Sequence, residues 1–110
     1  SLNPIDFGGF MAKYLDREGK WVSEEEHQQL VRDKHYPLVR KSVENGHIIS
    51  TVWLSWTEDP EELFETMIFK EGRFIDVYSM NYKTEKEAIE GHNDARKWLK
   101  HHLEEQNGRN

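Results

Sequence analysis

Two short runs of β-branched and aromatic residues, separated by an acidic break, constrain the fold of this chain more than any other feature. Residues 48–54 read Ile-Ile-Ser-Thr-Val-Trp-Leu, and residues 63–69 read Leu-Phe-Glu-Thr-Met-Ile-Phe. The break between them contains Asp59-Pro60, and proline cannot donate to a strand ladder. Since β-branched and aromatic residues are enriched in strands, the pattern predicts two strands of one sheet.

Two further segments extend this pair to a four-stranded antiparallel meander. Asn45-Gly46 lies between residues 38–44 and the strand that starts at His47, and this dipeptide favours a two-residue type I′ hairpin. Residues 63–69 and 74–80 flank a second turn, predicted at Glu71-Gly72. The first turn predicts three cross-strand pairs: Glu44 with His47, Val43 with Ile48, and Val39 with Val52. The second predicts four: Phe69 with Phe74, Ile68 with Ile75, Met67 with Asp76, and Glu65 with Tyr78.

Apolar residues occur on both faces of the predicted sheet, because side chains alternate along each strand. In the first hairpin the more apolar face holds Val39, Val43, Ile48, Val52, Leu54 and Trp56. The opposite, mixed face holds Leu38, Arg40, Ile49, Thr51 and Trp53. One helix covers one face only, so the other face is predicted to meet the N-terminal helix, the arm or another subunit. Five residues are candidates for that contact: Trp53, Met67, Phe69, Phe74 and Tyr78.

Two helices are predicted from their capping signals. Ser23, followed by Glu26, forms a capping box that opens a short, weakly apolar helix over residues 24–34. Thr84, followed by Glu87, is a second capping box and opens the long C-terminal helix. Apolar residues and one histidine recur along this helix at helical spacing: Ala88, Ile89, His92, Ala95, Leu99 and Leu103. This long helix is predicted to pack on the sheet, whereas the short helix is predicted to dock at an edge.

The predicted fold is therefore α+β: a four-stranded antiparallel meander, one long C-terminal helix and a short N-terminal helix. With 110 residues the chain is long enough for one domain. Residues 1–10, which contain Pro4 and Gly8-Gly9, are predicted to be a flexible arm or an artificial extension. Residues 11–106 are predicted to form the domain, and residues 107–110 a disordered tail.

Composition excludes several classes of site. The chain has no cysteine, so a disulfide framework, a thiolate zinc site and a cysteine nucleophile are absent, and a cytoplasmic setting is expected. No apolar run approaches the roughly 18 residues that span a bilayer, so no membrane partner is expected. The formal charge of -6 argues against direct nucleic-acid binding, and it suits either a soluble surface or an acidic mimic of nucleic acid.

The candidate catalytic residues are His92, Glu65 and Asp76. A histidine on an apolar helix stripe is more often packed and hydrogen-bonded than catalytic, but a carboxylate of the facing sheet could orient His92 as a general base. Glu65 and Asp76 interrupt otherwise apolar strands, which fits either an exposed sheet face near Arg40 or Lys41, or a small polar site. No compact metal-ligand spacing and no phosphate-binding glycine loop occurs, so no metal and no cofactor is expected.

Three motifs together resemble a group of small phage and prophage proteins. They are Ile49-Ser-Thr-Val-Trp-Leu54, Phe64-Glu-Thr-Met-Ile-Phe69, and Tyr82-Lys-Thr-Glu-Lys-Glu-Ala88 followed by Gly91-His92. The group carries the pattern STVWLG…FETMVF…Y-x-T-E-E-E-A-x-x-GH, and the similarity covers roughly residues 11–99. This chain departs from the group at Ser55 and in the acidic segment 57–62. The resemblance implies a phage or prophage origin in a bacterial host cell; it implies no activity.

Three function classes follow, in order of preference. The first is a non-catalytic protein-interaction module, expected to be a homodimer or to bind a host or phage protein. The second is a small enzyme with a site centred on His92 and Glu65, which requires a pocket that joins the two residues. The third is an acidic nucleic-acid mimic, which requires residues 24–26, 59–62 and the acids of the C-terminal helix to line one surface.

Overall fold

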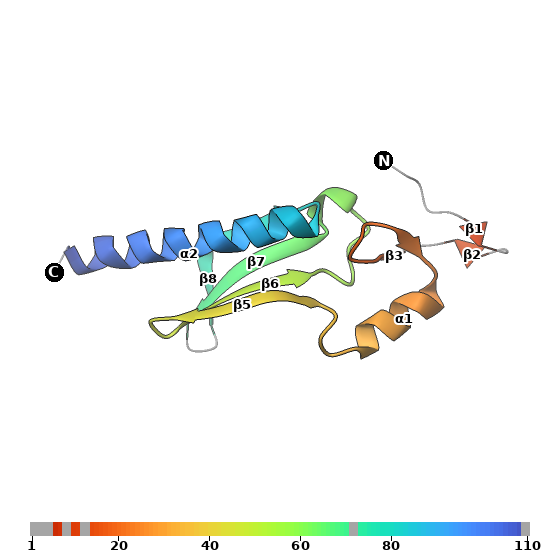
Figure 1. Ribbon diagram of the computed structural model, residues 1–110, viewed down its shortest axis with the longest axis horizontal. Helices are drawn as coiled ribbons and strands as arrows, with labels where there is room; N and C mark the ends of the chain where they lie inside the picture. The colour runs from red at the N-terminus through yellow and green to blue at the C-terminus, as the bar shows by residue number, and fades with distance from the viewer. Residues whose placement is uncertain (1–5, 8–9, 12–13, 71–72, 109–110) are drawn as a thin grey trace.

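The chain folds into an antiparallel sheet with one long helix along one face, which confirms the predicted α+β architecture (Figure 1). The computed structural model describes residues 6–7, 10–11, 14–70 and 73–108. The sheet has the order β5-β6-β7-β8, and the helix is α2 (Glu85–Gly108). Its four strands are β5 (Leu38–Glu44), β6 (His47–Trp53), β7 (Phe64–Lys70) and β8 (Arg73–Tyr82). A short 3-10 helix, η1 (Pro60–Glu62), connects β6 to β7.

The first hairpin forms at the predicted dipeptide. Asn45 and Gly46 have φ values of 49° and 76°, the left-handed backbone that a type I′ turn requires at both central positions. Two of the predicted pairs are confirmed: Glu44 with His47 and Val43 with Ile48. The third pair is wrong. Val52 pairs with Leu38 in place of Val39, because the ladder shifts between Leu38 and Arg40.

The second hairpin keeps its predicted register only beside the turn. Phe69 pairs with Phe74 as predicted, whereas Met67 pairs with Ser79 and Glu65 with Asn81. The predicted pairs of Met67 with Asp76 and of Glu65 with Tyr78 are therefore wrong. The ladder is irregular between Met67 and Phe69, where Ile68 lies. The cause is the length of β8, which has 10 residues opposite the 7 of β7. An edge strand accommodates the extra residues because its outer side has no partner to displace. The turn residues 71 and 72 lie outside the described residues.

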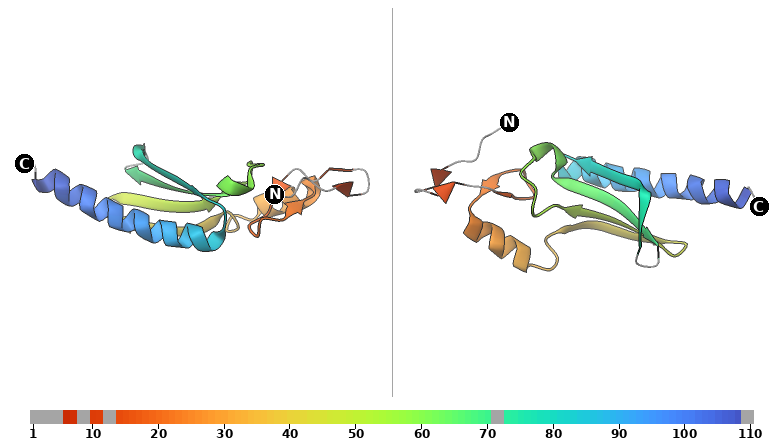
Figure 2. Two further views of the ribbon diagram at one scale, coloured as in Figure 1. Left: turned by 90° about the horizontal axis from the view of Figure 1, so that it is seen from above. Right: turned by 180° about the vertical axis from the view of Figure 1, so that it is seen from behind.

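Helix α2 covers the face that the sequence marked as mixed, not the more apolar one (Figure 2). Alternate residues of β6 and β7 are buried under it: His47, Ile49, Thr51, Trp53, Phe64, Thr66 and Ile68. The helix contributes Ala88, Gly91, His92, Ala95 and Leu99, which confirms the predicted stripe from Ala88 to Leu99. The small residues on the stripe let α2 lie close to the sheet, so the threonines below it can be hydrogen-bonded and buried.

The N-terminal part of the domain lies off one end of the sheet (Figures 1 and 2). It comprises β3 (Tyr14–Leu15), β4 (Trp21–Val22) and α1 (Glu24–Arg32), which has no buried residue. Ser23 caps α1 as predicted, since its hydroxyl accepts a hydrogen bond of 3.2 Å from the Glu26 N–H. The helix ends at Arg32, two residues before the predicted end, and it leaves the second sheet face uncovered.

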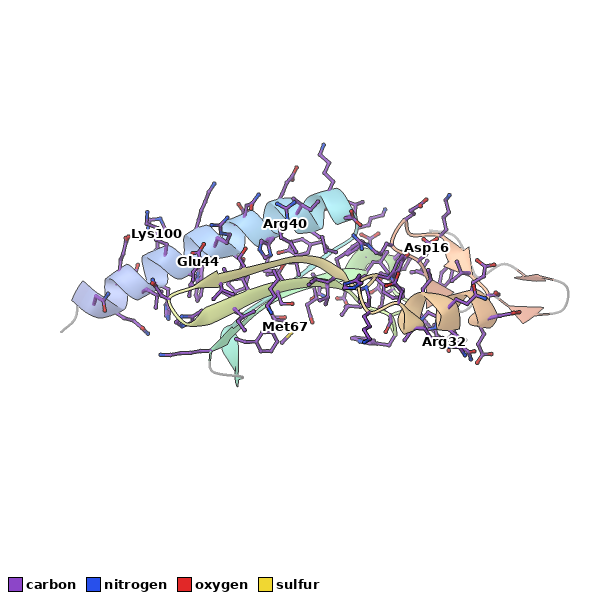
Figure 3. All side chains as sticks on the ribbon, turned by 60° about the horizontal axis from the view of Figure 1, so that its bottom comes forward. Asp16, Arg32, Arg40, Glu44, Met67 and Lys100 are labelled. Atoms are coloured by element: carbon purple, nitrogen blue, oxygen red, sulfur yellow. The ribbon has the colours of Figure 1, made fainter. Side chains whose placement is uncertain are left out.

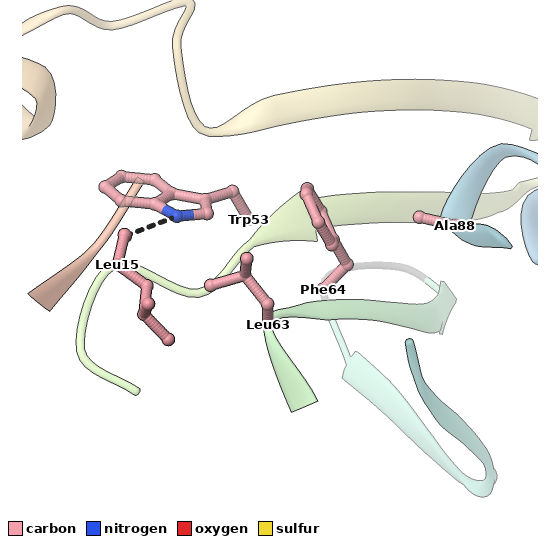
Figure 4. Close-up of a cluster of buried hydrophobic side chains, with 5 residues drawn as sticks. All are labelled: Leu15, Trp53, Leu63, Phe64 and Ala88. Carbon is pink, nitrogen blue, oxygen red and sulfur yellow. Dashed lines mark hydrogen bonds between the residues drawn. The ribbon is translucent and has the colours of Figure 1, made fainter. Parts of the chain in front are cut away.

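Trp53 connects this N-terminal part to the sheet (Figure 4). Its indole N–H donates to the Leu15 carbonyl at 3.1 Å, and the Tyr36 ring meets it edge-on at 4.9 Å between centroids. Trp53 belongs to a core cluster with Leu15, Leu63, Phe64 and Ala88. Arg17 adds a second link, because its guanidinium donates to Glu85 on α2 and to the Tyr36 carbonyl, the latter at 2.7 Å.

The two ends of the chain differ from the prediction in detail. Strands β1 (Asp6–Phe7) and β2 (Phe10–Met11) pair within a segment for which the sequence predicts no regular structure. Helix α2 continues through Asn107 and Gly108, two residues of the predicted disordered tail. Residues 104–106 are good helix formers, and an Asn or Gly at the terminal turn costs only about 1 kcal/mol relative to Ala, so the helix continues.

Candidate functional site: the His92 cluster and the open sheet face

His92 lies at the centre of a buried hydroxyl cluster between α2 and the sheet. The imidazole is 0% exposed. Its Nε2 lies 2.8 Å from Ser42 Oγ on β5, and its Nδ1 lies 2.8 Å from Thr51 Oγ1 on β6. Thr51 Oγ1 in turn hydrogen-bonds Thr66 Oγ1 on β7 at 2.5 Å. The histidine therefore joins three strands to the helix, and both of its ring nitrogens are hydrogen-bonded.

The surroundings of His92 favour the neutral imidazole. Burial lowers its pKa, the cationic side chains of Arg40 and Arg96 lower it further, and Glu44 acts in the opposite direction. Glu44 itself accepts a 2.7 Å hydrogen bond from Arg96 Nε. A neutral imidazole whose nitrogens both bind hydroxyl groups has no lone pair or proton directed at solvent. The cluster positions α2 on the sheet, and its geometry offers no general base to an outside substrate.

Acidification is expected to destabilise the protein through His92. In the unfolded chain this histidine takes up a proton near its ordinary pKa of about 6.5, whereas in the fold it stays neutral to lower pH. Stability is then complete above about pH 6.5 and falls as the pH drops toward the lowered pKa of the fold. Stability should therefore be lower at pH 5.5 than at pH 7.5, by at most about 1.4 kcal/mol for each pH unit below the unfolded-state pKa over which the imidazole stays neutral.

Urea unfolding followed by circular dichroism at the two pH values measures this loss. The variant His92→Gln should show a smaller pH dependence, since glutamine does not titrate. His101→Gln is the matched control, because His101 is exposed on the same helix. An equal pH dependence in wild type and His92→Gln would contradict the assignment.

Glu65 is on the other face of the sheet from His92. Along β7, Phe64, Thr66 and Ile68 are buried under α2, and Glu65 alternates with them. The carboxylate therefore cannot orient the imidazole, and the predicted site centred on these two residues does not assemble. The backbone of Asp76 lies in β8, in the irregular part of the ladder, and its side chain lies outside the described side chains.

None of the described helices covers the face of the sheet opposite α2, and this face carries a band of apolar side chains. Residues that pair across antiparallel strands share a face, so the register assembles this surface in rows. One row holds Val43, Ile48 and Phe69, the next holds Lys41, Ser50, Met67 and Ser79, and the third holds Val52, Glu65 and Asn81. Met67 points away from α2 in Figure 3, and Val43 is 66% exposed. These three rows are called the open face below.

The five predicted interaction residues divide between the two faces. Met67 and Phe69 lie on the open face and are half-buried, and Phe74 pairs with Phe69 in the backbone ladder. Trp53 lies on the face that α2 covers and is 2% exposed. Tyr78 packs on Trp98 of α2, with 5.0 Å between the ring centroids. The register shift in β8 moves Tyr78 to the helix side. Its burial there raises its pKa to about 12.

The sequence missed Ile48 and Val52 as surface residues, although their signal was present. Both alternate with the buried Ile49, Thr51 and Trp53, so they necessarily share the opposite face. Hydrophobicity alone does not single out the mixed face for burial, and the hydrogen bonds among Thr51, Thr66 and His92 satisfy the polar groups that the helix buries there.

The exposed edge at β5 is poorly suited to adding another strand. The ladder is irregular between Leu38 and Arg40, Pro37 precedes the strand, and Arg40 and Lys41 place two cations along it. Irregular, charged edges of this kind discourage strand addition. The open face is therefore a better candidate for contact with a partner than this edge.

Other features of the described surface add no chemical site. Shallow hollows lie near Trp56–Pro60, near Arg96–Lys100 and near Arg17–Glu18, and none of these three is lined by His92 or Glu65. Within the described residues, no group of three or more histidine, aspartate or glutamate side chains is arranged to hold a metal ion. None of the helices in the described ranges is long and apolar enough to cross a membrane.

Comparison of this chain with protein-family models, with curated proteins and with solved structures gives no match.

Proposed function

We propose that this chain is a small accessory protein of phage or prophage origin that acts in the host cytoplasm by binding proteins, and that it forms a homodimer through the open face. The observation that carries the proposal is the uncovered apolar surface of Val43, Ile48, Val52, Met67 and Phe69. Large contiguous apolar patches on soluble domains are typical of interaction sites. The phage origin rests on the resemblance of the strand and helix motifs.

The size of the open face suits a dimer of modest affinity. Four strands spaced about 4.8 Å apart, each of about seven residues, give a plan area on the order of 400 Å². Side-chain relief enlarges the accessible area, so two copies bury an area near the low end of specific interfaces, about 1,200 Å² in total. We therefore expect a dimer that is populated at micromolar concentration and dissociates on dilution.

A charge placed at Phe69 should convert the dimer to a folded monomer. Phe69→Glu buries a carboxylate in an apolar contact with no partner for it, which costs several kcal/mol. Light scattering over a dilution series measures the molar mass, and far-UV circular dichroism checks the fold. Val31→Glu is the control, because Val31 is an exposed apolar residue (46%) on α1, away from the open face.

The expected result is a dimeric wild type, a dimeric Val31→Glu and a monomeric Phe69→Glu with an unchanged fold. A wild type that stays monomeric up to several hundred micromolar overturns the homodimer. A Phe69→Glu variant that remains dimeric overturns the open face as the interface.

The two other function classes find less support in the geometry. An enzyme centred on His92 and Glu65 needs both groups in one pocket, and they lie on opposite faces of the sheet. A nucleic-acid mimic needs one continuous acidic surface. The acids of α1 and η1 lie on opposite sides of the β3–β4 hairpin (Figure 1), so they do not form such a surface.

A further inference from the structure

The open face carries two unlike charges that do not meet within one chain. Lys41 is on β5 and Glu65 is on β7, and among the described side chains in the three rows they are the charged ones. In the described part of the chain, neither takes part in an ion pair or a side-chain hydrogen bond. They are separated by two strands and one row, about 10 Å across the strands and about 7 Å along them.

Whatever covers the open face must compensate both charges. Burying a charge without a partner is strongly unfavourable, so a purely apolar partner surface would bind poorly here. The partner must present an acid over Lys41 and a cation over Glu65, at the spacing that separates these two residues. A second copy of this chain meets both requirements with the same two residues.

We propose that the two copies pair face to face about a two-fold axis, with Lys41 of each opposite Glu65 of the partner subunit. This inference rests on the proposed homodimer and names its contacts. In a symmetric interface the same patch is used twice, so any two-fold axis that sets Lys41 over the partner's Glu65 also sets Glu65 over the partner's Lys41. One geometry therefore compensates all four charges.

The position of the axis follows from the register. The midpoint between Lys41 and Glu65 falls on β6 between Ser50 and Val52, near the centre of the open face. The axis lies about 35° from the strands, so strands of the two copies cross at about 70°, close to the orthogonal class of sheet packing. Its line crosses β7 between Met67 and Phe69, which therefore pack near their own counterparts. A central axis covers the apolar residues on both copies, whereas an axis at the rim would leave half of them in water.

Charge reversal tests the pairing directly. Lys41→Glu places a carboxylate opposite the partner's Glu65 at two positions, and Glu65→Lys places two cations opposite one another. Each single variant should raise the dimer dissociation constant by about 10- to 100-fold, measured by sedimentation equilibrium. The double variant Lys41→Glu/Glu65→Lys restores both pairs, and its dissociation constant should return to within about threefold of wild type.

A matched control separates this pairing from the total charge of the face. Ser79→Lys lies in the same row as Lys41 at the other edge of the sheet. Lys41→Glu changes the net charge of the described open face from 0 to -2, and Ser79→Lys brings it back to -1, but the carboxylate introduced at position 41 still faces the partner's Glu65. The variant Lys41→Glu/Ser79→Lys should stay as weak a dimer as Lys41→Glu. An equimolar mixture of Lys41→Glu and Glu65→Lys should form a 1:1 heterodimer.

The outcomes distinguish the pairing from the dimer itself. Rescue by the double reversal but not by Lys41→Glu/Ser79→Lys supports the reciprocal pairs. Partial rescue by Lys41→Glu/Ser79→Lys, in proportion to the charge that it restores, overturns them in favour of a general charge effect. A wild-type dimer that Phe69→Glu disrupts and that the single reversals leave unchanged overturns the pairing while the homodimer stands. A monomeric wild type overturns both.

Discussion

Trp53→Ala is expected to destabilise the domain by about 3–5 kcal/mol, the range for removing a large buried aromatic side chain. Trp53, at the end of β6, is 2% exposed. It packs against residues of the sheet and of the β3–β4 hairpin, and against Tyr36. The substitution opens a cavity and leaves the Leu15 carbonyl without its 3.1 Å hydrogen bond. Since a small domain has only about 5–15 kcal/mol of stability, this loss is a large share of the total and should lower the urea midpoint markedly.

Two variants make the Trp53 result specific. Trp53→Phe keeps most of the packing but loses the N–H donor, so an intermediate loss of about 1–3 kcal/mol is expected. Trp56→Ala removes an aromatic ring that is 70% exposed, and it should change stability by no more than about 0.5 kcal/mol. Urea unfolding monitored at 222 nm measures all three. A Trp53→Ala variant as stable as Trp56→Ala would show that the N-terminal part of the domain is not anchored here.

Gly91→Ala should destabilise the protein by about 1–3 kcal/mol, although alanine is the better helix former by about 1 kcal/mol. A Cβ at position 91 would overlap the ring of Tyr82, which packs directly on the helix backbone. Tyr82 cannot easily withdraw. It is paired with Phe64 in the ladder, and its hydroxyl is buried near Thr66 without forming a hydrogen bond of good geometry.

Gly108→Ala is the matched control for Gly91→Ala, because both glycines lie in α2 and nothing lies within 4 Å of a Cβ at position 108. It should leave stability unchanged or raise it slightly. Thermal unfolding compares the two. The cycle with Tyr82→Leu adds a second check, since removal of the ring should reduce the penalty at position 91. An increase in stability for Gly91→Ala would mean that α2 does not approach β8 this closely.

The predictions were confirmed where a short local motif, such as a turn dipeptide or a helix cap, requires one backbone geometry. Asn45-Gly46 has the positive φ values that its turn type requires, and Ser23 caps the helix that follows it. Registers failed where an edge strand contained extra residues. An edge strand has only one neighbour, so it can bulge toward solvent without breaking a second ladder. Such a bulge requires no particular residue, and nothing in the sequence of residues 74–80 marks the irregularity in β8.

The choice of the buried face was the least predictable feature of the candidate site. Hydrophobicity favoured the face with Val43, Ile48 and Val52, whereas the helix covers the face with Thr51, Thr66 and His92. A single strand pattern does not reveal whether a polar residue will find a partner 15 or 41 positions away, as Thr51 does. Long-range hydrogen bonds made the polar face compatible with burial.

The hydroxyl cluster at His92 also fixes the helix along its length. Apolar contacts such as those of Ala88, Ala95 and Leu99 are not directional, so they define the position of α2 along its axis less sharply than hydrogen bonds do; one turn of the helix is about 5.4 Å long. A slide of α2 by one turn would move His92 away from both Ser42 and Thr51 and leave buried polar atoms unpaired. The hydrogen bonds of His92 therefore define the position of α2 along its own axis, which apolar contacts alone would define less sharply.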